Sequence, residues 1–456
     1  MVNRRNGSYL FTIYRLPFTI MLFDEALQYL LSLGHETLAI KLGLKNIERL
    51  LASLDNPQAS FIPVQIAGTN GKGSTAVMLN SIALAAGVNC GLYTSPHLAR
   101  ITERIKINGQ EIAREDFARL ATRVRATAES LRHEGALEAL PTFFEQVTAI
   151  ALLAFKEAGV RLAILETGLG GRLDATTAAG AQLVGITPIA LDHQEYLGAT
   201  LAEIAFEKAA IIRPGVEAVI APQELEALEV IDKRSVEMDV APHFAGSRFE
   251  ITGASDFGNL RVTFETEEDR YSNLQLGLRG RHQVVNAAVA ISMAERLRAL
   301  GFIIPRSAIM EGIASAEHAG RLELWQGQPG ILFDGAHNVA SARAFLDYLR
   351  EFIHAPVTLV FGAMRDKELA KMAELLFPAA RRLILTGMSN PRAAQPEMLR
   401  ETVPLGFDSE SVSLAHSPQD AAQMALRLTP PEGLIAVTGS LYLVGEMREL
   451  LSSKEA

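Results

Sequence analysis

Short apolar runs alternate with longer segments of helical periodicity along most of this chain. In its first two thirds the apolar runs predict four strands, at residues 61–67, 89–94, 161–166 and 182–189. Helical spacing predicts a first helix near Met21 and later helices at residues 115–132, 143–158, 201–212 and 282–300. Such alternation is typical of a parallel sheet wrapped by helices.

The pattern changes between residues 249 and 276, where β-type residues alternate with turn-forming ones, and we expect a small antiparallel sheet there. A second alternation begins near Gly320. It predicts strands at residues 331–333, 357–361, 382–385 and 434–437, and helices at residues 342–351 and 367–376. The expected fold class is α/β, with a parallel-sheet N-terminal domain that carries the small antiparallel sheet and a smaller doubly wound C-terminal domain. We place these domains at residues 21–315 and 316–456. The join around residues 313–320, with Gly312, Ser315 and Gly320, is expected to act as a hinge.

Residues 1–20 include an apolar run that is similar to a signal peptide. Arg15 and Pro17 interrupt this run and no small-residue cleavage site follows, so we expect a disordered extension and no export. The chain has no run of about 20 uninterrupted apolar residues, and therefore no membrane span is expected.

Composition narrows the function classes. The chain has 456 residues, of which 48% are hydrophobic and 21% charged, as is ordinary for compact globular domains. Its formal net charge of -9 argues against a protein that binds duplex nucleic acid. The single Cys90 excludes a disulfide framework and a cysteine metal site, and it favours a cytoplasmic location.

A glycine-rich loop follows the first predicted strand and opens a helix rich in alanine and leucine. It reads Gly68-Thr69-Asn70-Gly71-Lys72-Gly73-Ser74. Glycines let a backbone approach an anion, a helix N-terminus offers free N–H groups, lysine adds a charge and a serine hydroxyl suits Mg²⁺. The loop predicts a nucleoside triphosphate site, although Gly73 separates Lys72 from Ser74 where the usual motif has them adjacent.

Polar residues follow several other predicted strands, at the edge where parallel sheets bind ligands. Ser95, Glu166 and His193 each come directly after an apolar run or at its end. Taken singly, Ser95 would be a turn residue, Glu166 would form a salt bridge with Arg172, and His193 would be a structural histidine. Because they share one sheet edge with the glycine-rich loop, a common Mg²⁺ site is the sharper interpretation.

Further candidates are less specific. Lys208 lies on a predicted helix and would ordinarily be an exposed lysine. Arg321 opens the second domain. Asp334 and His337 follow its first strand, at a position that is a good ligand-facing edge and also a common αβ turn. Residues 168–171 lack the third glycine of a dinucleotide fingerprint, and a flexible substrate loop ending in Asp174 fits them better.

Taken together these segments resemble folylpolyglutamate synthase and dihydrofolate synthase, a branch of the Mur-type ATP-dependent amide ligases. The likeness extends through an ordered set of motifs over most of the chain, at residues 41–44, 68–74, 93–98, 142–145, 165–176, 191–193, 207–209, 320–323, 334–338 and 438–440. Each motif alone is weak, whereas the ordered set is highly specific.

The resemblance implies a role for each candidate. It implies that the nucleotide is bound by Thr69, Asn70, Gly71, Lys72, Gly73, Ser74, Asn286, Arg321, Asp334 and His337. It implies that magnesium, at two sites, is held by Ser95, Glu166, His193 and a carbamylated Lys208. It implies pterin-side contacts from Lys41, Leu42, Gly43, Leu44, Thr142, Phe143, Phe144, Glu145 and Asp174. The residues closest to the chemistry would be Lys72, Lys208 and His193.

The resemblance also implies the reaction. A carboxylate of dihydropteroate or of a folate attacks the γ-phosphate of ATP, and the amine of L-glutamate then displaces phosphate from the acyl phosphate. Closure of the second domain would protect that intermediate from water. We expect a monomer that has small-molecule partners and binds neither nucleic acid nor membrane.

The chain departs from the family pattern at the linker. It reads His318-Ala319-Gly320-Arg321, where many relatives carry Trp-Pro before Gly-Arg. Two other functions compete with the glutamate ligase. A Mur-type ligase acting on a UDP-linked cell-wall precursor is disfavoured because only about 60 residues precede the glycine-rich loop, fewer than a typical domain has. A non-catalytic nucleotide-dependent binding protein would not need the complete set of strand-edge residues.

Overall fold

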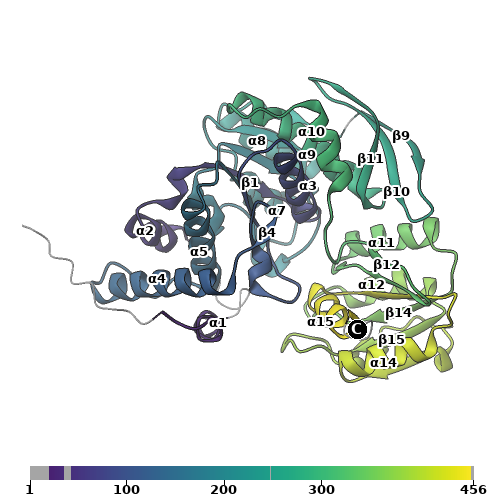
Figure 1. Ribbon diagram of the computed structural model, residues 1–456. Coiled ribbons are helices and arrows are strands. Elements are labelled where there is room, and N and C mark those ends of the chain that lie inside the picture. The colour runs from purple at the N-terminus through teal and green to yellow at the C-terminus, as the bar shows by residue number, and fades with distance from the viewer. Residues whose placement is uncertain (1–19, 35–42, 247, 453–456) are drawn as a thin grey trace, which may run out of the picture.

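The computed structural model describes residues 20–34, 43–246 and 248–452. Two α/β bodies lie side by side, and a small sheet extends from the first body toward the second (Figure 1). Among the described residues, no helix combines the length and the apolar character needed to cross a membrane. The predicted extension at residues 1–20 lies almost wholly outside the described part of the chain.

The first body is built on an eight-stranded sheet. Its strands occur in the order β4-β3-β2-β5-β1-β6-β7-β8. The six strands β2, β5, β1, β6, β7 and β8 are parallel. The two short strands β3 and β4 are antiparallel and form the edge next to β2. Their bounds are β1 Ile62–Ala67, β2 Cys90–Tyr93, β3 Ile105–Ile107, β4 Gln110–Glu111, β5 Leu162–Glu166, β6 Leu183–Ile186, β7 Glu217–Ile220 and β8 His243–Phe244.

Alternate residues of these strands pack against two helical layers, as the two-residue period of a strand requires. Ile164 faces the layer of α3, α9 and α10, whereas Leu165 faces the layer that contains α4 and α5. The helices are α1 Phe23–Ser32, α2 Lys45–Ser53, α3 Lys72–Ala85, α4 Arg114–His133, α5 Phe143–Glu157, α6 Gln194–Leu197, α7 Leu201–Ala209, α8 Leu225–Glu237, α9 His282–Ala299 and α10 Arg306–Ser315.

The expected antiparallel sheet is present and has three strands. They are β9 Phe249–Ala254, β10 Asn259–Glu265 and β11 Arg270–Arg279, in the order β11-β10-β9. Its apolar face packs into the same core cluster as α9 and α10. At the β9–β10 turn, the carbonyl of Phe257 accepts a hydrogen bond from the Tyr348 hydroxyl of α11 (3.0 Å), so this sheet touches the second body.

The second body has a six-stranded sheet in the order β12-β13-β17-β14-β15-β16, in which only β12 is antiparallel to its neighbour. Its strands are β12 Glu323–Trp325, β13 Gly330–Phe333, β14 Val357–Phe361, β15 Arg382–Thr386, β16 Val412–Ala415 and β17 Leu434–Thr438. Its helices are α11 Val339–Phe352, α12 Leu369–Leu376, α13 Pro396–Arg400, α14 Pro418–Leu428 and α15 Leu441–Ser452. Short 3₁₀ turns occur in both bodies, at Pro57–Ser60, Ile101–Arg104 and Ala175–Ala179 in the first and at Phe377–Ala379 and Ser409–Ser411 in the second.

Two details of the predicted organisation are wrong. The sequence pattern places Gly312 at the hinge, but this residue lies within α10, where a Cβ would come within 2.4 Å of the Ile82 backbone of α3. Its role is close helix packing, and only the turn after Ser315 is left to act as a hinge. The helix expected from Lys367 begins at Leu369 instead, and Lys367 points into the contact between the two bodies.

Candidate active site

The glycine-rich loop lies where the sequence predicts it, between β1 and α3. Gly71 adopts φ 91°, a conformation that residues other than glycine rarely take. A Cβ at Gly71 would come within 2.1 Å of Asn286 Oδ1 on α9. The loop therefore fits closely against α9 and forms a concave surface at the N-terminus of α3, which suits an anion.

Two lysines converge on this loop. Lys72 Nζ donates hydrogen bonds to the carbonyls of Gly68 (3.1 Å) and Thr69 (3.2 Å), and Lys208 Nζ donates to Gly68 (2.7 Å). Burial lowers the pKa of Lys72, and burial followed by the charge of Lys72 lowers the pKa of Lys208 to about 7. Lys208 is only 3% exposed, so the interpretation as an exposed helical lysine is wrong.

The strand-edge residues also meet at this loop. Glu166 ends β5 and is buried, and its Oε2 accepts a hydrogen bond from the Ser95 backbone N–H (3.2 Å). Burial raises its pKa, although the charge of Lys72 opposes that rise. The alternative salt bridge with Arg172 is wrong, because Arg172 pairs with Glu207 (2.8 Å).

His193 occupies the N-cap position of the short helix α6 without a side-chain capping hydrogen bond, and it has left-handed backbone geometry, with φ 51°. Burial lowers its pKa to about 3, even though Asp192 opposes the shift, so the imidazole is neutral near pH 7. Neutral imidazole is the form that can bind a cation.

A divalent cation fits this donor set. Glu166 is a buried carboxylate, and the charge of Lys72 only partly offsets the rise in pKa that its burial causes. No group of three or more His, Cys, Asp or Glu in the described part of the chain has the geometry of a complete metal site. Mg²⁺ commonly takes one or two protein carboxylates and fills its remaining positions with water and phosphate oxygens. A sparse protein contribution is therefore what a Mg²⁺–nucleotide site requires.

The predicted nucleotide residues line one cavity of about 330 Å³ between the two bodies. It contains residues of the glycine-rich loop together with Ser95, Glu166, His193, Lys208, Asn286, Arg321, Asp334 and His337. Asp334 accepts hydrogen bonds from the backbone N–H groups of Leu322 (2.9 Å) and Ala336 (3.0 Å), and burial raises its pKa while Arg321 opposes that rise.

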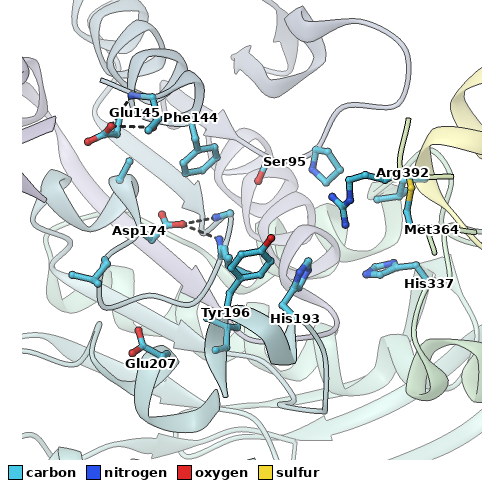
Figure 2. Close-up of a pocket in the computed structure, with 18 of the residues that line it drawn as sticks. Ser95, Phe144, Glu145, Asp174, His193, Tyr196, Glu207, His337, Met364 and Arg392 are labelled. Atoms are coloured by element: carbon cyan, nitrogen blue, oxygen red, sulfur yellow. Dashed lines mark hydrogen bonds between the residues drawn. The ribbon is translucent and has the colours of Figure 1, made fainter. Parts of the chain in front are cut away.

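A second cavity, of about 260 Å³, adjoins the first and shares Ser95, His193 and His337 with it. Figure 2 shows Phe144 and Tyr196 on one side of this pocket and His337, Met364 and Arg392 on the other. The first group comes from the N-terminal body and the second from the C-terminal body. An apolar ring system could lie along the first wall while a charged group faces Arg392.

The structure separates the predicted substrate residues into three groups. Gly43, Thr142, Phe144, Glu145 and Asp174 line the second cavity, whereas Lys41 and Leu42 lie outside the described residues. Phe143 and Leu44 pack against the hydrophobic core instead.

Several polar atoms of these pocket residues already have structural partners. Glu145 Oε2 accepts hydrogen bonds from the backbone N–H (2.7 Å) and hydroxyl (2.9 Å) of Thr142, completing a capping box at the start of α5. Asp174 Oδ2 accepts from the N–H groups of Gly168 and Leu169 (2.9 Å each). These hydrogen bonds therefore hold the loop that ends in Asp174 in one conformation.

Sequence patterns alone do not reveal a group of residues that joins the two bodies. Asp192 of the first body accepts a hydrogen bond from Lys367 Nζ (2.5 Å) and one from Asn338 Nδ2 (3.1 Å). Burial alone would raise the pKa of Asp192, but the hydrogen bond and charge of His337, together with His193 and Lys367, hold it well below the usual range. Lys367 follows β14 closely, so the strand-edge rule that found Glu166 could have found it.

His318 of the linker stands out in the sequence only as a departure from the family pattern. It is packed against the glycine-rich loop, where its Nδ1 lies 3.3 Å from Ser74 Oγ. A Cβ at Gly73 would come within 2.9 Å of His318 Cε1 and 3.3 Å of both Glu166 carboxylate oxygens. The extra glycine of the loop therefore leaves room for these two side chains.

Comparison with known proteins agrees with this geometry. The family model of the Mur ligase middle domain matches residues 66–294, and that of the Mur ligase glutamate ligase domain matches residues 320–441. The dihydrofolate synthase/folylpolyglutamate synthase of Bacillus subtilis is 34% identical over 427 residues, which cover 92% of this chain and 97% of that protein. A probable bifunctional folylpolyglutamate synthase/dihydropteroate synthase of Haloferax volcanii is also 34% identical, but the chain spans about half of its length.

Solved structures give the same result. E. coli FolC in complex with DHPP and ADP has a TM-score of 0.84 at 30% identity, with 96% of this chain and 99% of that chain covered. Mycobacterium tuberculosis folylpolyglutamate synthase complexed with ADP has a TM-score of 0.87 at 30% identity, with 94% and 98% covered. The chain therefore belongs to the dihydrofolate synthase/folylpolyglutamate synthase family, whose members are ATP-dependent glutamate ligases built from Mur ligase middle and C-terminal domains.

Proposed function

We propose that this ligase adds L-glutamate both to dihydropteroate and to the γ-carboxylate of a reduced folate. The observation that supports this most directly is the pair of adjoining cavities that share Ser95, His193 and His337. The larger cavity suits ATP because it contains the glycine-rich loop, and the smaller one suits a pterin because Phe144 and Tyr196 form an aromatic wall. Their common boundary is where a substrate carboxylate meets the γ-phosphate.

The reaction follows from that meeting point. A carboxylate oxygen of the substrate forms a bond to the γ-phosphorus as the bond to ADP breaks, which gives an acyl phosphate. The amine of L-glutamate then attacks the acyl carbon, and phosphate leaves with the oxygen that attacked. Lys72 and the N–H groups at the start of α3 offset the phosphate charge, an effect worth several kcal/mol in such sites.

Support for the substrate assignment also comes from relatives. FolC of E. coli has been solved with DHPP and ADP, and a bifunctional folylpolyglutamate synthase/dihydrofolate synthase with Mn, AMPPNP and L-glutamate. We propose that the incoming glutamate lies at the second-domain wall of the smaller cavity, where Arg392, which also pairs with Asp366 (2.9 Å), supplies a cation for one of its carboxylates. A single chain carries the whole proposed site, which agrees with a monomer.

The substrate proposal is tested by offering the protein ATP, Mg²⁺ and labelled glutamate with dihydropteroate or with tetrahydrofolate in separate reactions. We expect label in the pterin product of both. Label from only one of them would show a monofunctional enzyme, and ATP hydrolysis without incorporation would contradict the ligase assignment.

We propose that Ser95, Glu166 and His193 hold Mg²⁺, which when bound neutralises phosphate charge. The buried carboxylate of Glu166 supports this role, because burial raises its pKa and a cation would stabilise its ionised form. Glu166→Gln keeps the shape and removes the charge. We expect it to weaken Mn²⁺ binding in the presence of ADP, measured by calorimetry, more than tenfold, and to leave pterin affinity within twofold. Unchanged metal affinity would remove Glu166 from the site.

We further propose that Lys208 is carbamylated and contributes to a second metal site. CO₂ adds to a neutral amine, and the pKa of about 7 makes neutral Lys208 abundant at physiological pH. Its Nζ already lies inside the nucleotide cavity. Native mass spectrometry of protein held in bicarbonate should show the mass of one added CO₂, which Lys208→Met loses. Equal masses for both proteins, after allowing for the substitution, would contradict carbamylation.

A further inference from the structure

Asn338 begins the second body's helix α11 and reaches across to the first body. Its Oδ1 accepts a hydrogen bond from the Ser341 backbone N–H (2.8 Å) and so caps the helix. Its Nδ2 donates to Asn70 Oδ1 (3.0 Å) and to Asp192 Oδ2 (3.1 Å). The side chain is buried, so one amide group both caps α11 and connects it to the other body.

Both acceptors belong to segments that shape the nucleotide cavity. Asn70 is part of the glycine-rich loop, and its backbone N–H donates to the Pro188 carbonyl (3.2 Å). Asp192 directly precedes His193, and its Oδ1 accepts from the His193 backbone N–H (2.9 Å). Asn338 thereby connects the N-terminus of α11 to the glycine-rich loop and to the segment that carries His193.

Two basic side chains of the second body also lie against Asp192, in addition to the neutral amide of Asn338. Lys367 Nζ lies 2.5 Å from Oδ1, and His337 Nε2 lies 3.4 Å from Oδ2. Asp192 is 8% exposed, and Lys367, His337 and Asn338 of the second body all lie against its carboxylate. Loss of a donor leaves a buried carboxylate with an unsatisfied acceptor, and undocking of the second body would remove these second-body donors together.

We propose that Asn338 is a positioning residue, whose Nδ2 couples docking of the second body to the shape of the glycine-rich loop and so to nucleotide affinity. This inference rests on the proposal that ATP occupies the larger cavity. It assigns to Asn338 no contact with the reacting atoms.

Two substitutions separate the coupling from the helix cap. Asn338→Ser keeps a good N-cap residue and removes the amide donor, while Asn338→Asp keeps the cap and the shape but places a carboxylate oxygen where Nδ2 was. The amide of Asn70 can turn to donate to this new carboxylate, whereas the carboxylate of Asp192 has no proton to donate. Asp192→Asn, added to Asn338→Asp, removes the repulsion and restores a donor.

The experiment measures Mg²⁺–ADP binding by calorimetry, and KM for ATP and kcat by steady-state kinetics. We expect both single variants at Asn338 to raise the ADP dissociation constant and KM for ATP about 5- to 100-fold, with Asn338→Asp the weaker binder. Relative to Asp192→Asn alone, the double variant should show little further loss, a coupling that a double-mutant cycle detects. Unfolding midpoints close to that of the wild type check that α11 remains capped.

Three results would overturn the proposal. ADP affinity and KM within twofold of wild type in both single variants would show that the hydrogen bonds are incidental. A lower unfolding midpoint with unchanged KM would show a purely structural cap. Wild-type protein that fails to bind Mg²⁺–ADP would overturn the nucleotide assignment as well, which distinguishes failure of the proposed function from failure of this coupling.

Discussion

At the scale of single residues, the site is defined by charges that the fold buries. Lys72, Lys208, Glu166 and Asp192 all lie in one cavity, and each of them is buried or half-buried. Burying an ionised group is costly unless a partner is supplied. A cluster of such groups with shifted pKa values in one cavity is typical of a site that binds a charged ligand.

The first prediction concerns Lys72. Lys72→Ala removes the cation that we propose offsets the phosphate charge, and we expect kcat to fall about 10²- to 10³-fold, as for other groups that stabilise transition-state charge. Circular dichroism and the unfolding midpoint should remain near those of the wild type. Turnover like that of the wild type would contradict the assignment of this loop to phosphate.

The second prediction concerns the pH dependence of stability at Lys208. Its pKa is about 7 in the folded protein and 10.5 as the ordinary value, so between these the unfolded chain holds a proton that the folded protein does not. The free energy of unfolding should therefore rise with pH across this range. Below pH 7 both states are protonated, and the wild type bears the full cost of the buried charge.

Urea denaturation of wild type and Lys208→Met in CO₂-free buffers measures this effect. We expect the wild type to gain stability relative to Lys208→Met as pH rises from 7 to 10. A constant difference between the two proteins would show that Lys208 titrates as an ordinary exposed lysine.

At the scale of elements, strand ends are predictable from the sequence and inter-element contacts are not. Apolar runs locate β1, β5 and β6, and because parallel strands end at one edge, the sequence alone places Glu166 beside the glycine-rich loop. The burial of Lys208 depends on α7 packing against Gly68, which is 140 positions away. The Asn338–Asp192 contact spans 146 positions, and no local pattern encodes either.

A third prediction tests the fit of the glycine-rich loop. Gly71→Ala would place a Cβ 2.1 Å from Asn286 Oδ1 and also strain a residue at φ 91°. Gly135→Ala is a matched control, because Gly135 has φ 75° but a Cβ added there would meet no atom within 4 Å. The backbone strain common to both is about 1–2 kcal/mol.

We expect Gly135→Ala to lower stability by about that strain and to keep its KM for ATP. Gly71→Ala should also lose nucleotide affinity, because Asn286 or the loop must move. If both variants bind Mg²⁺–ADP equally well, the close contact between the loop and α9 has no part in nucleotide binding.

At the scale of the whole molecule, the two bodies meet through contacts of unequal worth. Arg281 Nε lies 2.7 Å from Glu351 Oε2 across the contact, but the Arg281 side chain is 56% exposed. The buried group around Asp192 lies beside the nucleotide cavity. Exposed ion pairs contribute about 0–1 kcal/mol, so we assign the coupling between bodies to Asp192 and its partners.

The fourth prediction follows from this difference. Arg281→Ala should change the free energy of unfolding by less than about 1 kcal/mol and leave KM for ATP within twofold. Urea denaturation and steady-state kinetics measure the two quantities. A large rise in KM would mean that the exposed pair, and not the buried group, sets the docking of the second body.

We propose that ATP phosphorylates a substrate carboxylate between the two bodies before glutamate attacks. The most direct test uses dihydropteroate whose carboxylate carries ¹⁸O in both oxygens, with ATP, Mg²⁺ and L-glutamate. Mass spectrometry then follows the label into phosphate and product. The mechanism predicts one ¹⁸O in each released phosphate and one in the new amide. Unlabelled phosphate, formed together with amide product, would contradict it.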